Sequence, residues 1–369
     1  MSVSNKVTHV LITLMFVAFL WPMAIDAQGR GGGRPSPADS RNLRGVLGDV
    51  PMTAADSAIK EVVDLLDFES YKSLIRGLTE FGDREQGTPR NAAAVDWIEQ
   101  TLQGWGYQTD RIYYDYMPRG SDVTEPREEV YATLVGASSP GEMYILGGHM
   151  DGRGGGQAAN DDASGTALVM EIARALASSG VTSARSIRFA LWNNEETGLN
   201  GARAYVEQRQ GLQGIEEPAG SGNYPEPRWL GMVQHDMMLW DHGNPVTHSQ
   251  ALDADVDIEF QLNSEMADAS AQLALALLNA NRMFATHYPA VMSNAMSNTD
   301  SGPFQDIVAA VSLRENRRLY ETGNRANPHW HQPTDLFVTF SDDDFRLGFN
   351  AAQTTLGAIA RLVEARVER

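Results

Sequence analysis

The chain has 369 residues, of which 42% are hydrophobic, and it carries a formal net charge of -19 and no cysteine. The negative charge argues against nucleic acid or an anionic lipid surface as a partner, because both would be repelled. The absence of cysteine excludes disulfides, thiolate metal ligands and a cysteine nucleophile.

The N-terminus has the pattern of an export signal. A weak positive charge at Lys6 precedes the apolar run VLITLMFVAFL (10–20), which is too short to span a bilayer comfortably, and small residues near Ala27 suit cleavage. We therefore predict a signal peptide over 1–27 and a secreted or periplasmic protein with no stable membrane association. An uncleaved anchor is the alternative.

Residues 28–55 are rich in Gly, Pro, Ser and Arg, which is typical of a flexible linker, and the folded catalytic domain is predicted over 56–369.

Helix and strand patterns alternate through this domain. Three helices are predicted first, over 58–66, 71–78 and 92–105, followed by a strand from Arg111 and strands over 130–135 and 143–146. Next come a helix over 163–177, a strand over 186–192, a helix over 199–209, a loop over 215–227 and a strand over 230–233. A strand over 256–261, a helix over 264–280, a strand over 307–313 and a helix over 342–367 complete the order. The alternation predicts a three-layer α/β/α sandwich with a largely parallel, mixed sheet, whose sites gather at the carboxyl ends of strands.

The stretch GGHMDGRGGGQAANDDASG (147–165) combines a glycine-rich loop with a histidine and three aspartates. Phosphate binding explains it poorly, because GRGGG is not followed by Lys-Ser or Lys-Thr and does not fit G-x-G-x-x-G. A metal site explains it better, since His149 and Asp151 project to the same side of an extended chain. A carboxylate there can accept the second N–H of His149 and fix the tautomer that binds metal. Asp161 and Asp162 open the next helix, where aspartates also act as ordinary caps, and the glycines let the loop fold back.

Two adjacent glutamates, Glu195 and Glu196, follow the strand over 186–192 in the motif WNNEETG. Such a pair can simply complement a helix dipole. At a strand end, however, one glutamate can bind metal while the other takes a proton from water, which metal-assisted hydrolysis requires. Asp236 ends a third strand, where the plain alternative is a turn aspartate.

The motif NPHWHQPTD (327–335) places His329 and His331 on either side of Trp330 in a loop bounded by prolines. A single surface histidine usually has no role, but two beside a tryptophan make this loop a candidate source of the last metal ligand.

Taken in order, H-x-D, D-D-x-S-G, E-E, D and H on successive strand ends resemble the di-zinc aminopeptidase superfamily. That superfamily includes bacterial leucyl aminopeptidases, glutamate carboxypeptidase II and the glutaminyl cyclases. The resemblance covers roughly residues 56–369 and is strongest over 144–201 and 327–335. It implies a zinc-exopeptidase fold, two zinc ions per chain and a peptide substrate. The sequence therefore predicts an exported metallo-exopeptidase, most simply an aminopeptidase.

The resemblance also implies residue roles. The histidine of H-x-D binds zinc, which here is His149, and its aspartate, Asp151, supports that ligand. The first aspartate of D-D-x-S-G, here Asp161, bridges both metals, and its peptide to the next residue is typically cis. In the glutamate pair, Glu195 is the implied general base and Glu196 a ligand.

Asp236 and His331 complete the implied ligand set. The last ligand heads an H-x-x-x-D motif, which selects His331 over His329 and places Asp335 at its end. One zinc would be held by His149, Asp161 and Asp236, and the other by Asp161, Glu196 and His331. These N and O donors also suit manganese or cobalt.

Two departures keep other functions open. A tyrosine often precedes the last histidine in the peptidases and helps to bind the oxyanion, but here the residue is Trp330; Tyr320 is a candidate substitute. Glutaminyl cyclases, which use one zinc, carry a tryptophan there, so a cyclase is the alternative, although DDASG and NNEETG look more like the peptidases. A non-catalytic ectodomain, as in transferrin receptors, is a third possibility, but such proteins lose metal ligands and none is missing here.

Overall fold

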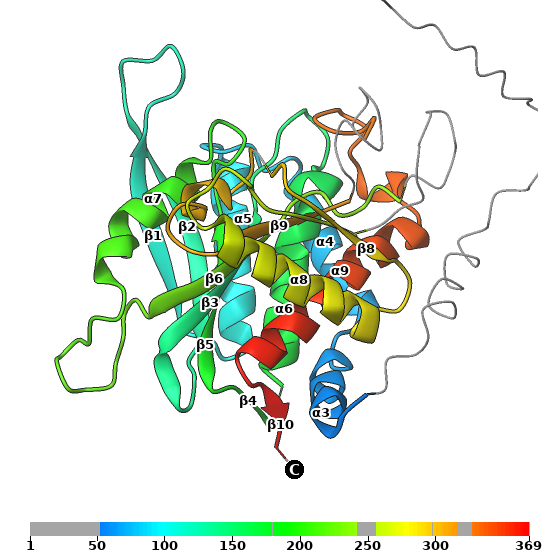
Figure 1. Cartoon of the computed structure of the whole chain (residues 1–369). Helices are drawn as coiled ribbons and strands as arrows, with labels where there is room; N and C mark the ends of the chain where they lie inside the picture. Colours follow the sequence, from blue (N-terminus) through cyan, green and yellow to red (C-terminus); the bar gives the residue numbers. More distant parts are fainter. Residues whose placement is uncertain (1–51, 179, 242–255, 297, 316–326, 369) are drawn as a thin grey trace, which may run out of the picture. The chain divides into compact units, whose positions relative to one another are not determined.

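The computed structural model describes residues 52–178, 180–241, 256–296, 298–315 and 327–368 (Figure 1). The predicted signal peptide, nearly all of the predicted linker and Tyr320 lie outside these residues. Among the helices that are described, none combines the length and the apolar character that a membrane crossing needs.

A mixed sheet of eight strands in the order β1-β2-β5-β3-β6-β9-β7-β8 organises the described residues (Figure 1). Its four central strands run parallel: β5 (Arg185–Trp192), β3 (Ser139–His149), β6 (Arg228–His235) and β9 (Ala310–Arg314). The hairpin of β1 (Thr109–Tyr116) and β2 (Glu125–Leu134) joins β5 in antiparallel fashion. On the other side, β7 (Val256–Glu259) is antiparallel to β9 and parallel to β8 (Ala290–Ser293).

Side chains of the central strands alternate between two hydrophobic cores. In β5, Ile187, Phe189 and Leu191 belong to one core, whereas Ala190 and Trp192 belong to the other. Because both faces are covered, these strands read as nearly continuous apolar runs in the sequence.

Helices cover both faces of the sheet, as the layered prediction requires. The larger core receives α3 (Ala54–Val63), α4 (Phe68–Thr79), α5 (Pro89–Gly104), α6 (Ser164–Leu176), α8 (Ala267–Phe284) and α9 (Asp342–Leu362). The smaller core receives α7 (Asn200–Arg209). Short helical turns are η1 (Ala159–Ala163), η2 (Gln210–Leu212), η3 (Gly302–Phe304) and η4 (Phe337–Thr339). The predicted α/β/α architecture is therefore confirmed.

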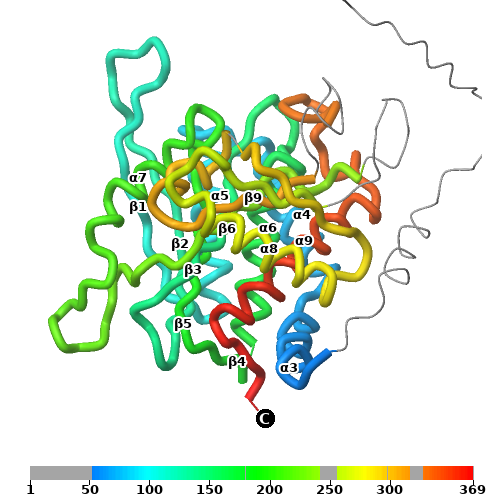
Figure 2. Tube along the Cα trace, in the orientation of Figure 1, coloured from blue at the N-terminus to red at the C-terminus, as the bar shows by residue number. Residues whose placement is uncertain are grey.

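The structure differs from the sequence prediction at some element ends and in three short strands. The predicted C-terminal helix stops at Leu362, because the chain turns at Glu364, whose φ is 57°. The last residues form β10 (Arg366–Val367), which pairs with β4 (Val181–Thr182) and contacts α3 (Figure 2). The strands β4, β8 and β10 were not predicted, since two to four residues carry too little periodicity.

Candidate metal centre

The carboxyl ends of the parallel strands bring the predicted site residues together. His149 is the last residue of β3, Glu195 and Glu196 follow β5, and Asp236 follows β6. Asp161 comes from η1, between β3 and α6, and His331 comes from the loop that precedes η4. This arrangement follows the general rule that sites in such sheets lie beyond the carboxyl ends of the strands.

Asp161 lies between the two histidines. Its Oδ1 lies 3.2 Å from Nε2 of His149, and its Oδ2 lies 3.1 Å from Nε2 of His331. Its side chain is 5% exposed. A buried carboxylate that turns one oxygen toward each of two imidazoles is arranged as a ligand shared by two metal ions would be.

One donor set consists of Asp161, Glu196 and His331, whose ligand atoms lie within 4.8 Å of one another. Oε2 of Glu196 lies 2.8 Å from Nε2 of His331. The second oxygen of Glu196, Oε1, is buried and has no hydrogen-bond partner among the residues that the structure describes. Because an unpaired buried carboxylate oxygen is costly, this atom fits a position beside a cation.

The second donor set consists of His149, Glu195 and Asp236, again within 4.8 Å of one another. Oδ1 of Asp236 lies 3.8 Å from Nε2 of His149, and Asp161 also reaches that nitrogen. Both sets offer only nitrogen and oxygen donors, which zinc accepts, and three protein ligands leave one zinc position open. Glu195, the predicted base, thus lies within reach of the metal ligands.

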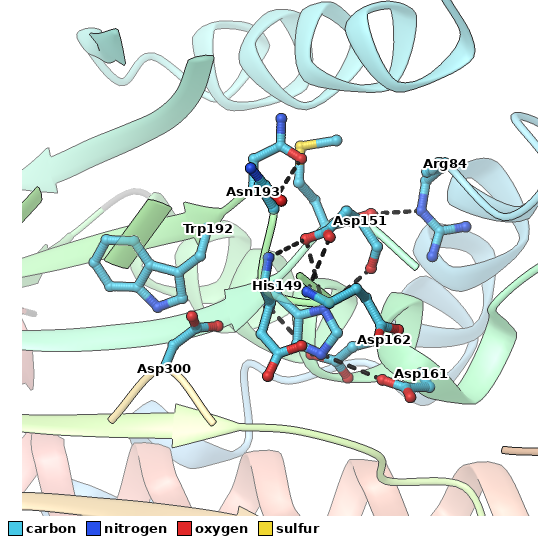
Figure 3. Close-up of polar contacts among 12 residues, drawn as sticks. Arg84, His149, Asp151, Asp161, Asp162, Trp192, Asn193 and Asp300 are labelled. Carbon is cyan, nitrogen blue, oxygen red and sulfur yellow. Dashed lines mark hydrogen bonds and ion pairs between the residues drawn. The ribbon is translucent and has the colours of Figure 1, made fainter. Parts of the chain in front are cut away.

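Asp151 acts differently from the sequence prediction. Nδ1 of His149 lies 3.0 Å from the backbone oxygen of Asp151, whereas Oδ1 of the same residue is 3.8 Å away (Figure 3). The carboxylate instead accepts hydrogen bonds from the backbone N–H groups of Glu195, at 3.0 Å, and Glu196, at 3.3 Å. The prediction that this carboxylate fixes the His149 tautomer is therefore corrected: the carbonyl orients the imidazole, and the carboxylate orients the glutamate pair.

Asp335 and Asp162 hold the backbone around the shared carboxylate. Asp335 accepts hydrogen bonds from the N–H groups of Asn160, at 2.8 Å, and Asp161, at 3.1 Å. Asp162 accepts from the N–H groups of His149, at 3.1 Å, and Gly165, at 2.8 Å. The peptide between Asp161 and Asp162 is cis, as the resemblance implied. The H-x-x-x-D aspartate thus positions Asp161 rather than the histidine that precedes it.

His329 and His331 have different surroundings. Nδ1 of His329 lies 3.0 Å from Oγ1 of Thr334, and its ring packs edge-on against Trp240, with centroids 5.7 Å apart. His331 faces Asp161 and Glu196, as described above. The structure therefore brings His331, and not His329, to the donor set. The ring of Trp330 packs against that of His331, with centroids 4.4 Å apart.

Negative charge is in surplus at the centre. Burial raises the pKa of Glu195 well above its usual range, and the charges of Asp300 and Asp236 raise it further, against the effect of His149. Burial also raises the pKa of Glu196 to about 7, with Asp161 as the next cause. Carboxylates that oppose one another's ionisation in a buried place favour the binding of a divalent cation.

Three buried residues near the centre were missed by sequence reasoning. Arg314 ends β9 with Nη2 3.1 Å from Oδ2 of Asp236, and its strand-end position was the signal that could have identified it. Asp300 is buried, and its Oδ2 accepts a hydrogen bond from Gln234 at 3.3 Å. Arg84 lies on a turn far from the motifs, and no local pattern marks it.

Part of the sequence matches a known protein family and curated relatives. Residues 129–352 match the model described as peptidase family M28. A probable zinc metalloprotease of Leptosphaeria maculans is 31% identical over 170 residues, which are 40% of this chain and 39% of that protein. The chain thus matches less than half the length of this curated relative.

Solved structures share the fold. An aminopeptidase from Aneurinibacillus sp. strain AM-1 superposes with a TM-score of 0.62 at 15% identity, covering 85% of this chain and 97% of that one. A glutaminyl cyclase of Porphyromonas gingivalis has a TM-score of 0.58 at 17% identity, covering 82% of this chain and 99% of that one. At such identities the likeness concerns the fold.

Proposed function

The chain belongs to peptidase family M28, and from that premise we propose that it is an exported two-zinc exopeptidase that removes residues from the N-terminus of peptides. The observation that carries the proposal is the carboxylate of Asp161, which turns one oxygen to His149 and the other to His331. Because Asp161 faces a histidine of each donor set, its carboxylate can serve both, as suits a pair of neighbouring metal ions.

Under this proposal, one zinc would be held by His149, Asp161 and Asp236, and the other by Asp161, Glu196 and His331. Bound zinc would polarise the carbonyl of the scissile bond and lower the pKa of a nearby water. The donor chemistry supports zinc, because imidazole nitrogens and carboxylate oxygens are among its ordinary ligands.

Glu195 would act as the general base of the reaction. Its carboxylate would accept a proton from the attacking water and deliver it to the amine of the leaving product. Its position supports this role, because its carboxylate lies within 4.8 Å of the ligand atoms of His149 and Asp236. Asp151 would orient it through the hydrogen bond from the N–H of Glu195.

A glutaminyl cyclase is the second candidate, because Trp330 packs against the ring of His331. In that case the chain would convert an N-terminal glutamine and release ammonia, using one zinc.

The decisive experiment measures product masses. The zinc-loaded protein is incubated with free peptides, N-terminally blocked peptides and peptides that begin with glutamine. Stepwise loss of N-terminal residues from the free peptides alone would support the aminopeptidase. Loss of C-terminal residues would move the chain to the carboxypeptidases, and loss of ammonia from the glutamine peptides would identify a cyclase.

Export is part of the same proposal and rests on residues 1–27 alone. Expression with a C-terminal tag, followed by N-terminal mass analysis of the protein outside the cytoplasm, would test it. A mature N-terminus near Ala27 would support export, whereas an intact chain in the cytoplasm would contradict it.

A further inference from the structure

Arg84 lies on the turn between α4 and α5, and its side chain binds the glycine-rich loop. Its side chain is fully buried, and it lies outside the residues that match the family model. Its Nε donates a hydrogen bond to the carbonyl of Met150 at 2.7 Å (Figure 3). Nη1 donates to the carbonyl of Gln157 and Nη2 to that of Ala158, each at 2.8 Å.

These carbonyls stand at the two ends of the loop. Met150 directly follows the ligand His149, and Ala158 lies three residues before the shared ligand Asp161. One guanidinium therefore joins the two segments that carry these ligands. The planar fork of arginine directs its donors along fixed, diverging lines, so it also sets the distance between the segments.

The backbone of Arg84 supports this arrangement. Its φ is 50°, in the left-handed region that residues with a side chain rarely occupy. Such a conformation persists where the surrounding structure enforces it. Here, the side chain of Asn91 donates to the carbonyl of Arg84 at 2.8 Å, and the side chain of Asp83 accepts from the N–H of Gly155 at 3.0 Å.

The loop also approaches the turn closely at Gly152, where there is no room for a Cβ atom. A Cβ on Gly152 would lie 2.7 Å from the carbonyl oxygen of Asp161 and 3.0 Å from that of Asp83. Gly152 of the loop therefore lies close both to Asp83, which precedes Arg84, and to the shared ligand Asp161. A displacement of this turn would reach Asp161 through Gly152.

We propose that Arg84 is a positioning residue of the metal centre, which fixes the separation of His149 and Asp161 and thereby the zinc affinity of the half that they share. The inference deepens the proposed function and rests on its metal centre. The role is geometric, because each of the hydrogen bonds described goes to a backbone carbonyl rather than to a carboxylate. Hydrogen-bond partners of the metal ligands themselves typically change affinity 10- to 100-fold when they are replaced, and for Arg84, which binds the backbone beside the ligands, we expect the lower end of this range.

The test is Arg84→Lys in the full chain. Lysine keeps the positive charge, but its single ammonium group cannot reproduce the fork between Met150 and Ala158. We expect one zinc-binding step to weaken by about tenfold or more. Affinity is measured without substrate, by competition with a chromophoric chelator, and urea unfolding in excess chelator measures stability in parallel.

Arg188→Lys is the matched control. Arg188 is a second buried arginine, which binds Tyr205, a residue of the smaller core, and Glu226. This variant should lose stability and keep its zinc affinity. Arg84→Lys that folds and binds both zinc ions as tightly as the wild type would overturn the proposal.

A second variant covers the case in which Arg84→Lys fails to fold. Gly152→Ala places a methyl group against the Cβ of Ala158 and 2.7 Å from the carbonyl oxygen of Asp161, without removing any charge. It should therefore weaken zinc binding, as Arg84→Lys does. Gly211→Ala, in open space, should change nothing. Wild-type zinc affinity in Gly152→Ala would count against the proposal. If the wild-type chain binds zinc but cleaves no peptide, the proposed function fails while this test still decides the role of Arg84.

Discussion

Oδ2 of Asp161 lies 3.1 Å from Nε2 of His331, although one residue precedes α6 and the other lies close to α9. The other oxygen of the same carboxylate lies 3.2 Å from His149. The two donor sets are therefore joined through one side chain, and each histidine belongs to one set only. This separation allows each half of the centre to be tested by itself.

His331→Ala should lose one of two zinc ions and keep the other. The imidazole is the only nitrogen ligand in its donor set, so without it this set keeps only the carboxylates of Asp161 and Glu196. His329→Ala is the matched control, because its ring faces Thr334 and Trp240 instead. Zinc is counted by elemental analysis of dialysed protein. Loss of zinc in His329→Ala, but not in His331→Ala, would reverse the assignment.

Glu195→Gln should keep the metal and lose turnover by about 10²- to 10⁴-fold, the usual contribution of a general base. Kinetics and zinc content are measured on the same preparation, and exposed Glu207→Gln serves as the control. Glu195 also lies in a donor set with His149 and Asp236, so zinc content tests whether it is a ligand instead of a base. A folded variant that loses one zinc would make Glu195 a ligand.

Arg314→Met should destabilise the metal-free protein by about 3–5 kcal/mol, the range for breaking a buried ion pair. The change leaves Asp236 and Glu259 without this buried cation, whose atoms lie 3.1 Å and 3.4 Å from them. Zinc should restore part of the stability, since a bound dication also compensates Asp236. Urea unfolding in chelator and in saturating zinc measures both values. The control Arg188→Met should lose the same stability in chelator and in zinc. Equal losses of stability for Arg314→Met would show that Arg314 does not interact with the metal centre.

Glu129 should make folding stability fall as the pH rises. Burial raises the pKa of this carboxyl well above its ordinary 4.5, Asp300 and Asp151 raise it further, and the N–H of Asn193 opposes the shift. The folded protein then keeps a proton that the unfolded chain loses above pH 4.5, so stability declines from there upward, by at most about 1.4 kcal/mol per pH unit.

Glu129→Gln removes this titration while keeping the shape of the protonated acid. Its stability relative to the wild type should therefore grow between about pH 5 and about pH 7. Urea unfolding of chelator-treated protein at several pH values measures the difference, with Glu207→Gln as the control. A difference that stays constant with pH would mean that Glu129 is ionised in the folded protein.

Much of the fold and the composition of the centre could be predicted because the informative residues are local in sequence. Trp192 ends an apolar run, and Glu195 and Glu196 follow within four residues, so strand, turn and carboxylates appear in one short window. The layered sheet and the family resemblance are both confirmed. The catalytic and ligand roles of the individual residues remain predictions, although the structure brings His149, Asp161, Asp236 and His331 together.

The supporting contacts could not be predicted, since they join segments distant in sequence. Asp335 binds the backbone of Asn160 and Asp161, and nothing near Asp335 indicates that partner. The contact of Arg84 with Met150 likewise depends on how α4 packs beside the loop. The role of Asp151 was misjudged for a related reason: sequence identifies a side chain, but it does not tell whether the carboxylate or the carbonyl faces the histidine.

The order of the strands has a consequence for chain synthesis. His149 and Asp161 precede the strands β5, β6 and β9 in the sequence, whereas His331 follows them. A ribosome must therefore translate all three of these strands between the first ligands and the last one, before both halves of the centre can assemble. A nascent or prematurely terminated chain would contain the glutamate pair and the shared aspartate, but it would lack the histidine that completes the second set. If the proposed activity is correct, unfinished chains would be unable to digest neighbouring polypeptides inside the cell that makes them.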